Sequence, residues 1–173
     1  MTQQTLRMVF GFGLVVVIMM MTTILPEMAT QNSADQTEPR QVSWDLTEIY
    51  PTDEAWTREK ERLEQEVEGL SQYEGTLGES AAALRVALDA ISASDKELAR
   101  LYVYAFLKAD EDRRIAENQE RRSTAASLLS EFGEATSFVS PELLQVGSET
   151  IETYLAEDTG LEKHAFSLRN ILR

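Results

Sequence analysis

The sequence contains no cysteine and only one histidine among its 173 residues. Without cysteine the chain has no disulfide, no thiolate ligand for zinc and no cysteine nucleophile. The single histidine, His164, cannot make a helical HExxH zinc motif, which needs two. These two shortages exclude most zinc and thiol chemistry from the chain itself.

The common catalytic and phosphate-binding motifs are also missing. A Ser-His-Asp triad needs one histidine, but it also needs a nucleophile on a sharp turn, and the sequence has no GxSxG elbow. GxGxxG, GxxxxGK[ST] and EF-hand loops do not occur. We therefore predict no catalytic, cofactor-binding or metal-binding residue, and we expect this chain alone to be inactive as an enzyme.

Positive charge is scarce relative to negative charge. The chain has 30 acidic and 16 basic residues, which gives a net charge of −14. Nucleic-acid binding depends on Lys and Arg that neutralise phosphates, so we do not expect nucleic acid as a partner.

The N-terminus is predicted to be a targeting segment. Arg7 is followed by an apolar run without charge, residues 8–25, so residues 1–26 are either a cleaved signal peptide or an uncleaved membrane anchor. Residues 27–41 are polar and lack periodicity, which is typical of a flexible, disordered linker. The predicted location is outside the cytoplasm: periplasmic, extracellular or anchored on the outer face of the cytoplasmic membrane, with possible membrane contact through residues 8–25.

Residues 42–173 are predicted to form one all-α domain of several helices. Thr52 is a natural N-cap for the first helix, and Asp53 and Glu54 suit its first turn. Apolar residues then recur at helical spacing up to Gly75. The later helix starts are marked by a hydroxyl residue, at Ser80, Ser94 (a capping box with Glu97), Ser140 before Pro141, Ser148 and Thr159. The charged run after Lys108 predicts a turn before a long helix that ends near Thr136.

The last predicted helix runs to Arg173 with an apolar face that needs a partner. That face consists of Leu161, Ala165, Leu168, Ile171 and Leu172. Because no C-cap glycine or polar tail follows, we expect the domain to be truncated at its C-terminus.

Two groups of residues have both a functional and a structural interpretation. His164 could be a ligand or base, but no second ligand accompanies it, so a partly exposed helical residue is expected. Trp44, Tyr50 and Trp56 could line a peptide groove, and the favoured interpretation is that Trp44 and Tyr50 pack the start of the domain onto the first helix.

Two acidic runs also allow both kinds of interpretation. The run over residues 59–68 could attract basic peptides, but its interspersed Lys60 and Arg62 favour a solvated face with near-neighbour ion pairs. Residues 110–112 could hold calcium, but without EF-hand spacing they indicate a turn between helices.

Three stretches, in order, resemble the oligoendopeptidase F-type zinc metallopeptidases. WDLTEIYP at residues 44–51 resembles the opening of these enzymes, and LYVYAFLKADEDRR at residues 101–114 resembles their third helix and the charged turn after it. Residues 135–173 resemble the start of their N-terminal lobe domain. Together these stretches cover nearly all of residues 44–173.

The resemblance implies a large helical zinc metalloendopeptidase that cleaves short peptides in an enclosed cavity. Its HExxH helix and a later glutamate would lie outside this chain, in a missing C-terminal catalytic part that would be the main partner. Zinc is therefore expected in the full-length protein and not in these residues. Two alternatives remain: a non-catalytic, membrane-tethered helical module that binds peptides or proteins, and one half of a split enzyme.

Overall fold

The computed structural model describes residues 43–173, so the predicted leader and linker lie outside the described residues. As predicted, this part is all-α, and residues 43–173 contain no strand. None of the helices described there has the length and apolar composition needed to cross a bilayer. The elements are α2 (Asp53–Gly69), η1 (Leu70–Tyr73), α3 (Ala81–Glu111), α4 (Ala116–Ala135), α5 (Val139–Val146), α6 (Ser148–Glu157), η2 (Thr159–His164) and α7 (Ala165–Ile171).

The first helix, α2, begins where local chemistry predicts. The Thr52 side chain accepts a hydrogen bond from the backbone N–H of Ala55 at 3.2 Å, and thereby satisfies one of the free amides of the first turn. Trp56, Leu63 and Val67 recur on one face and are buried, as the spacing predicts.

The prediction that Ser94 starts a new helix is wrong. Residues 81–111 form one continuous helix of 31 residues, and Ser94 lies buried in its middle with only 4% of its surface exposed. No proline or glycine interrupts residues 81–111, so the local capping signal does not outweigh the packing of a continuous helix.

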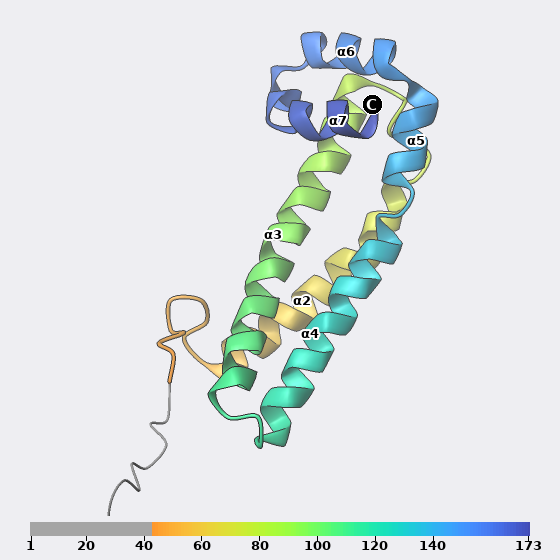
Figure 1. Cartoon of the computed structure of the whole chain (residues 1–173). Helices are drawn as coiled ribbons and strands as arrows, with labels where there is room; N and C mark the ends of the chain where they lie inside the picture. Colours follow the sequence, from red (N-terminus) through yellow and green to blue (C-terminus); the bar gives the residue numbers. More distant parts are fainter. Residues whose placement is uncertain (1–42) are drawn as a thin grey trace, which may run out of the picture. The chain divides into compact units, whose positions relative to one another are not determined.

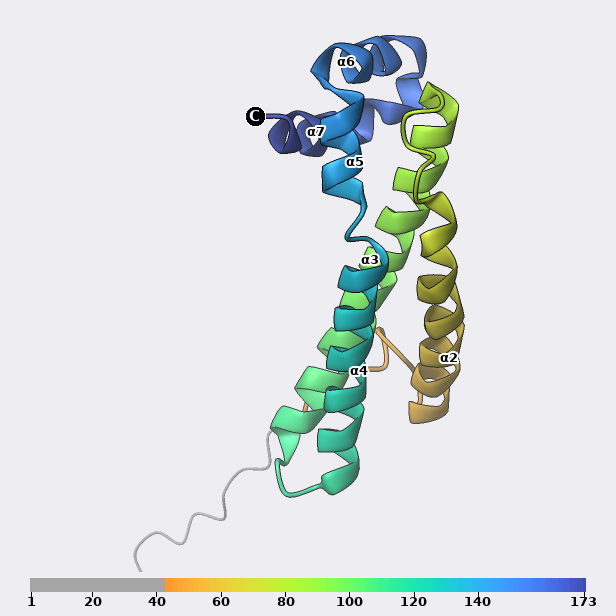
Figure 2. The same cartoon turned by 90° about the vertical axis from the view of Figure 1, so that its right-hand side faces the viewer.

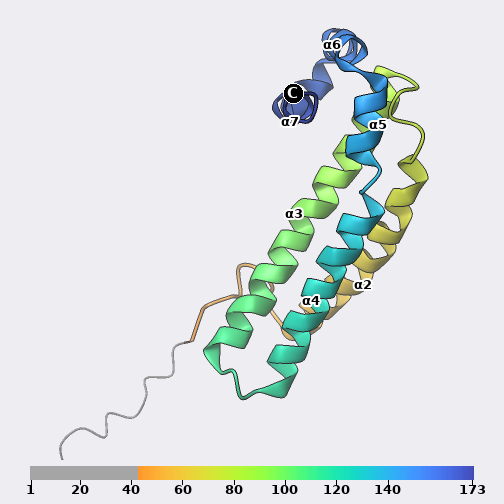
Figure 3. The same cartoon turned by 45° about the vertical axis from the view of Figure 1, so that its right-hand side comes forward.

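Helices α2, α3 and α4 form an antiparallel bundle. α3 and α4 lie side by side, joined by a short turn after Glu111, and α2 packs across the same face of both (Figure 1 and Figure 2). Beyond the bundle, α5, α6 and α7 gather around the N-terminal part of α3 (Figure 3).

Two separate apolar cores stabilise these two regions. The bundle core contains Leu46, Tyr50, Trp56, Leu63, Val67, Leu98, Leu101, Tyr104, Ala105, Ala125 and Leu128. The second core contains Leu77, Ala81, Leu84, Ala87, Leu143, Ile151, Leu161 and Leu168. Only α3 contributes residues to both.

The C-terminal helices begin at positions that differ slightly from the prediction. α5 begins at Val139, so Pro141 occupies its third position and not its first. Ser148 is the first residue of α6 and not its cap, because Gly147 precedes it with a φ of 82° that suits glycine.

The last predicted helix is divided into η2 and α7, and its apolar face has a partner within the chain. Leu161 and Leu168 are fully buried in the second core, and Ile171 and Leu172 pack against it half-buried. The expectation that this face is unpartnered is therefore wrong, and it no longer supports a binding module that works through that face.

Candidate functional site

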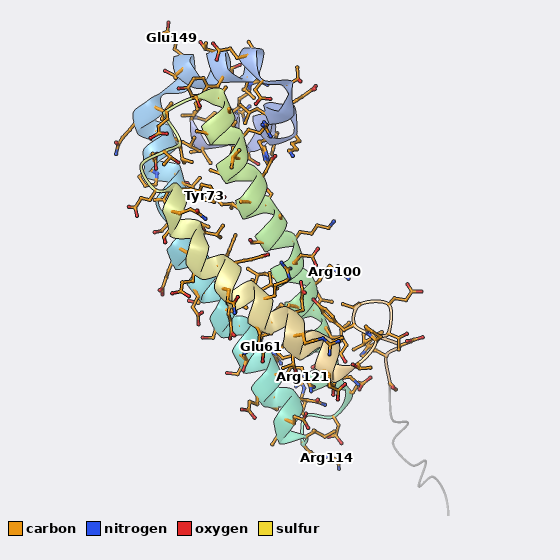
Figure 4. The ribbon with its side chains drawn as sticks, turned by 180° about the vertical axis from the view of Figure 1, so that it is seen from behind. Glu61, Tyr73, Arg100, Arg114, Arg121 and Glu149 are labelled. Atoms are coloured by element: carbon orange, nitrogen blue, oxygen red, sulfur yellow. The ribbon has the colours of Figure 1, made fainter. Side chains whose placement is uncertain are left out.

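Three helices meet at a buried arginine, Arg121 of α4 (Figure 4). Its side chain is 6% exposed, and the guanidinium forms a salt bridge with Asp53 Oδ2 at 3.0 Å and donates a hydrogen bond to Asn118 Oδ1 at 2.8 Å. Tyr104 of α3 donates its hydroxyl to the other Asp53 oxygen at 2.6 Å. We refer to Asp53, Tyr104, Asn118 and Arg121 as the Arg121 junction, which joins the start of α2 to α3 and α4.

Aromatic packing surrounds the Arg121 junction. The guanidinium lies 5.5 Å from the centre of the Trp56 ring, and Trp56 Nε1 donates to the backbone carbonyl of Leu101 at 3.0 Å. Burial, and then the hydrogen bond to Asp53, raise the pKa of Tyr104, so its hydroxyl stays protonated at neutral pH. A protonated phenol and a permanently charged arginine hold the helices in register, and neither is suited to proton transfer.

The Arg121 junction was not predicted from the sequence, although a signal exists. Arg121, Ala125 and Leu128 follow one another at helical spacing, and all three are buried. An arginine on an otherwise apolar stripe needs a buried acceptor, and the acidic first turn of α2 supplies it.

The WDLTEIYP stretch forms a compact turn before α2. Asp45 Oδ1 accepts from the backbone N–H of Thr47 at 3.1 Å and from its hydroxyl at 2.6 Å. This turn places Leu46 and Tyr50 on one side, where both are buried in the bundle core. Burial raises the pKa of Tyr50 to about 12.

The turn contacts α3, and only part of the aromatic prediction is confirmed. Tyr50 is buried and meets Tyr104 edge-on, with ring centres 5.4 Å apart. Trp44 is instead 49% exposed, so its predicted packing role is wrong. The backbone N–H of Trp44 donates to Glu111 Oε1 at 2.8 Å. The Trp44 side chain stays outside the core because the turn directs Leu46 and Tyr50 into it.

His164 pairs with an acidic side chain on α3. Its Nε2 lies 2.7 Å from Asp89 Oδ1, and its side chain is 11% exposed. Lys163 Nζ lies 2.8 Å from the same oxygen, and these two partners, His164 first, hold the pKa of Asp89 below its usual range. The contact fixes the end of η2 to α3.

These groups do not fit the zinc site that the resemblance implies for the full-length protein. The oxygen of Asp89 is already shared by His164 and Lys163, and a cationic lysine opposes a metal ion. Within residues 43–173 no three His, Asp or Glu side chains lie in a metal-binding arrangement.

Both acidic runs adopt the structural role expected of them. Lys60 pairs with Glu64 at 2.9 Å, and Arg62 pairs with Glu59 and Glu66 along the outer face of α2. Residues 110–112 end α3 and lead into the turn, where hydrogen bonds from the side chain and the backbone N–H of Arg114 lower the pKa of Asp112 to about 2.

An acidic groove lies between α2 and α4. Five glutamates line it, from both helices: Glu61, Glu64, Glu68, Glu131 and Glu134. Gln65, Val67 and Ala135 complete its lining. The side chains that line the groove are carboxylates, one amide and apolar groups, so its chemical character is acidic.

Several known peptidases are similar to this chain. No family model matches the sequence. Oligoendopeptidase F (plasmid) of Lactococcus lactis subsp. cremoris is 36% identical over 120 residues, which are 69% of this chain and 20% of that protein. Group B oligopeptidase PepB of Streptococcus agalactiae is 34% identical over 121 residues, 70% of this chain and 20% of that protein. The crystal structure of oligoendopeptidase-F from Enterococcus faecium has a TM-score of 0.65 and 28% identity over 69% of this chain and 24% of that one.

The chain thus spans about a fifth of the length of the curated relatives it matches. On the basis of these matches the chain belongs to the oligoendopeptidase F-type peptidase family.

Proposed function

We propose that this chain is the N-terminal helical lobe of an exported, zinc-dependent oligoendopeptidase that hydrolyses short peptides. The observation that carries the proposal is the 36% identity to an oligoendopeptidase F of which the chain spans only 20%. A match of that extent supports a shared part of a larger enzyme better than a separate activity.

In this proposal the catalytic groups lie outside these 173 residues. The sequence has no HExxH motif, and its one histidine, His164, already pairs with Asp89. Zinc and the glutamate that activates water would come from the catalytic part, where bound zinc would polarise the scissile carbonyl. This chain would supply a stable helical wall whose register depends on the Arg121 junction.

Export is the second element of the proposal. Arg7 followed by the uncharged run over residues 8–25 supports a signal peptide or membrane anchor. Fusing residues 1–41 to an alkaline phosphatase reporter, which is active only outside the cytoplasm, tests this element. Reporter activity is expected, and replacing Val15 and Val17 in the apolar run by Asp should abolish it; a fusion that stays inactive contradicts export.

A chimaera tests the peptidase assignment. The matched segment of Lactococcus lactis oligoendopeptidase F is replaced by the corresponding residues of this chain, and cleavage of a fluorogenic oligopeptide is measured with and without a metal chelator. We expect chelator-sensitive cleavage. The matched control carries Leu101→Asp, which places a charge at a fully buried position and should abolish folding and activity.

Two results would contradict the proposal. One is a chimaera that folds, as judged by circular dichroism, but cleaves no peptide. The other is cleavage by the 173-residue chain alone, because that would locate catalytic groups within it.

A further inference from the structure

The pair of helices α3 and α4 has one side that α2 does not cover. On its covered side, α2 contacts Leu101 and Tyr104 of α3 and Arg121 of α4. On the opposite side, no helix of residues 43–173 lies against the lower part of the pair, and α7 lies on that side above it (Figure 2). We refer to this opposite side as the outer face of α3–α4.

An aromatic stack lies on the outer face. Tyr102 and Phe106 are each two residues from Tyr104, so at 100° per residue each lies about 160° around α3 from it and points away from α2. Their ring centres are 6.0 Å apart. The guanidinium of Arg122, on α4, lies 4.6 Å from the centre of the Phe106 ring. The stack therefore joins α3 to α4 on the side that faces away from α2.

The rest of the outer face is apolar and small. Val103, next to the stack on α3, is 44% exposed. Ala126 and Gly133 share a face of α4 with Arg122, and both are exposed. Arg122 forms no salt bridge within residues 43–173, whereas residues 59–66 of α2 carry several on its exposed face. Small residues beside aromatic ones allow another helix to approach closely, so this face has the composition of a helix-packing surface.

We infer that the remainder of the peptidase packs on the outer face of α3–α4, through an apolar helix face with an acidic residue opposite Arg122. This inference rests on the proposed function. The chain spans only 20% of the Lactococcus lactis relative, so most of such an enzyme has to pack against it. α7 lies on the same side as the outer face, so chain that continues from α7 starts beside it (Figure 2). The net charge of −14 disfavours a second copy of this chain as the occupant, because two copies repel each other.

Hydroxyl-radical footprinting tests the inference, because it labels aromatic side chains that water reaches. The full 173-residue chain is compared with the chimaera described above, in which this chain replaces the matched segment of Lactococcus lactis oligoendopeptidase F. Tyr102 and Phe106 are expected to react about threefold more slowly in the chimaera than in the free chain, because a packed interface excludes water. Trp44, which is 49% exposed and lies outside the outer face, is the internal control and should react equally in both.

Two valines of α3 supply a matched pair of variants. Val103 is 44% exposed and Val86 is 48% exposed, but Val86 lies five turns before Tyr104 and so on the other side of the helix. In the chimaera, Val103→Glu places a charge in an apolar contact and should restore the labelling of Tyr102 and Phe106 to the rate of the free chain. Val86→Glu should leave their protection unchanged. Circular dichroism checks that both variants are folded.

The outcomes separate this inference from the proposed function. An active chimaera that labels Tyr102 and Phe106 as fast as the free chain does would overturn the inference alone. A folded chimaera that protects both residues but cleaves no peptide would support this packing surface and contradict the peptidase assignment.

Sedimentation of the free chain is a second measurement that needs no chimaera. A monomer is expected, with Tyr102 and Phe106 open to labelling. A dimer that Val103→Glu dissociates and Val86→Glu does not would assign the outer face to a second copy and overturn the inference. Protection of both aromatic residues in the free monomer would also overturn it, because the face would then already be covered.

Discussion

The Arg121 junction leads to an asymmetric prediction for two substitutions that break the same ion pair. Asp53→Asn removes the negative charge and keeps the size of the side chain, whereas Arg121→Met removes the positive charge and keeps an apolar stem over Trp56. The two partners differ in burial: the Arg121 side chain is 6% exposed, and that of Asp53 is 46% exposed. The cost of each substitution depends on the charge that stays behind.

Asp53→Asn leaves a buried guanidinium whose remaining acidic partner is Glu117, which is 75% exposed. A buried group without its partner costs its desolvation energy, so the free energy of unfolding should fall by about 2 kcal/mol. Arg121→Met leaves Asp53, which water can reach, and replacing a buried charge by an apolar side chain is often close to neutral. We expect a loss of about 1 kcal/mol or less.

The assay is urea unfolding of the full chain at pH 7, followed by far-UV circular dichroism. The double variant completes a cycle, and a coupling energy of about 1 kcal/mol is expected between two side chains in contact. Glu117→Gln is the matched control, because it removes an exposed partner of the same arginine and should cost less than about 0.5 kcal/mol. The reasoning is refuted if Arg121→Met costs more than Asp53→Asn, or if the two effects simply add.

Two further predictions concern the ion pairs that Arg85 and Asp89 of α3 make with the C-terminal residues. Gly160→Ala places a Cβ 2.4 Å from Arg85 Cδ, so Arg85 must move away from Asp158. We expect the free energy of unfolding in urea to fall by about 1 kcal/mol. Gly133→Ala, at an open position of α4, should instead raise the free energy of unfolding by about 0.5–1 kcal/mol. Equal signs for the two glycines would contradict this account of their surroundings. Asp89 has a lowered pKa, so it contributes stability above its unfolded-state value of 3.8 and loses that contribution as the pH falls through its folded-state value. Asp89→Asn should therefore destabilise the chain at pH 6 but much less at pH 2, as measured by the urea midpoint; a loss that is the same at both pH values would contradict the pairing with His164.

Local sequence signals predicted the helical class and several helix ends. Thr52 caps α2 because its hydroxyl needs only the amides of the next turn, and the acidic residues that follow it favour the same end. The predicted helix start at Ser94 is wrong for the opposite reason. Its capping box is also local, but the helix on either side of it is anchored by two cores that the local pattern does not reveal.

Contacts between distant residues were the hardest to predict. The Arg121 junction joins residues far apart in the sequence, and no short pattern pairs Asp53 with Arg121. Trp44 was expected to be buried because large aromatics usually are, but the Asp45 turn directs its neighbours into the core and leaves Trp44 outside. In the same way, the apolar face of the C-terminal residues, with Leu161 and Leu168, packs against α3 and α5. The periodicity of that face shows that it is apolar but does not show which helices it contacts.

The central claim is that this chain is one part of a larger zinc oligopeptidase. The measurement that tests it most directly is the genomic DNA sequence for several hundred codons beyond Arg173. The account predicts a continuation, in frame or after a frameshift, that encodes an HExxH helix and a later glutamate. A reading frame that ends at Arg173, with no such sequence after it in any frame, would contradict the claim and leave a helical module without catalytic groups.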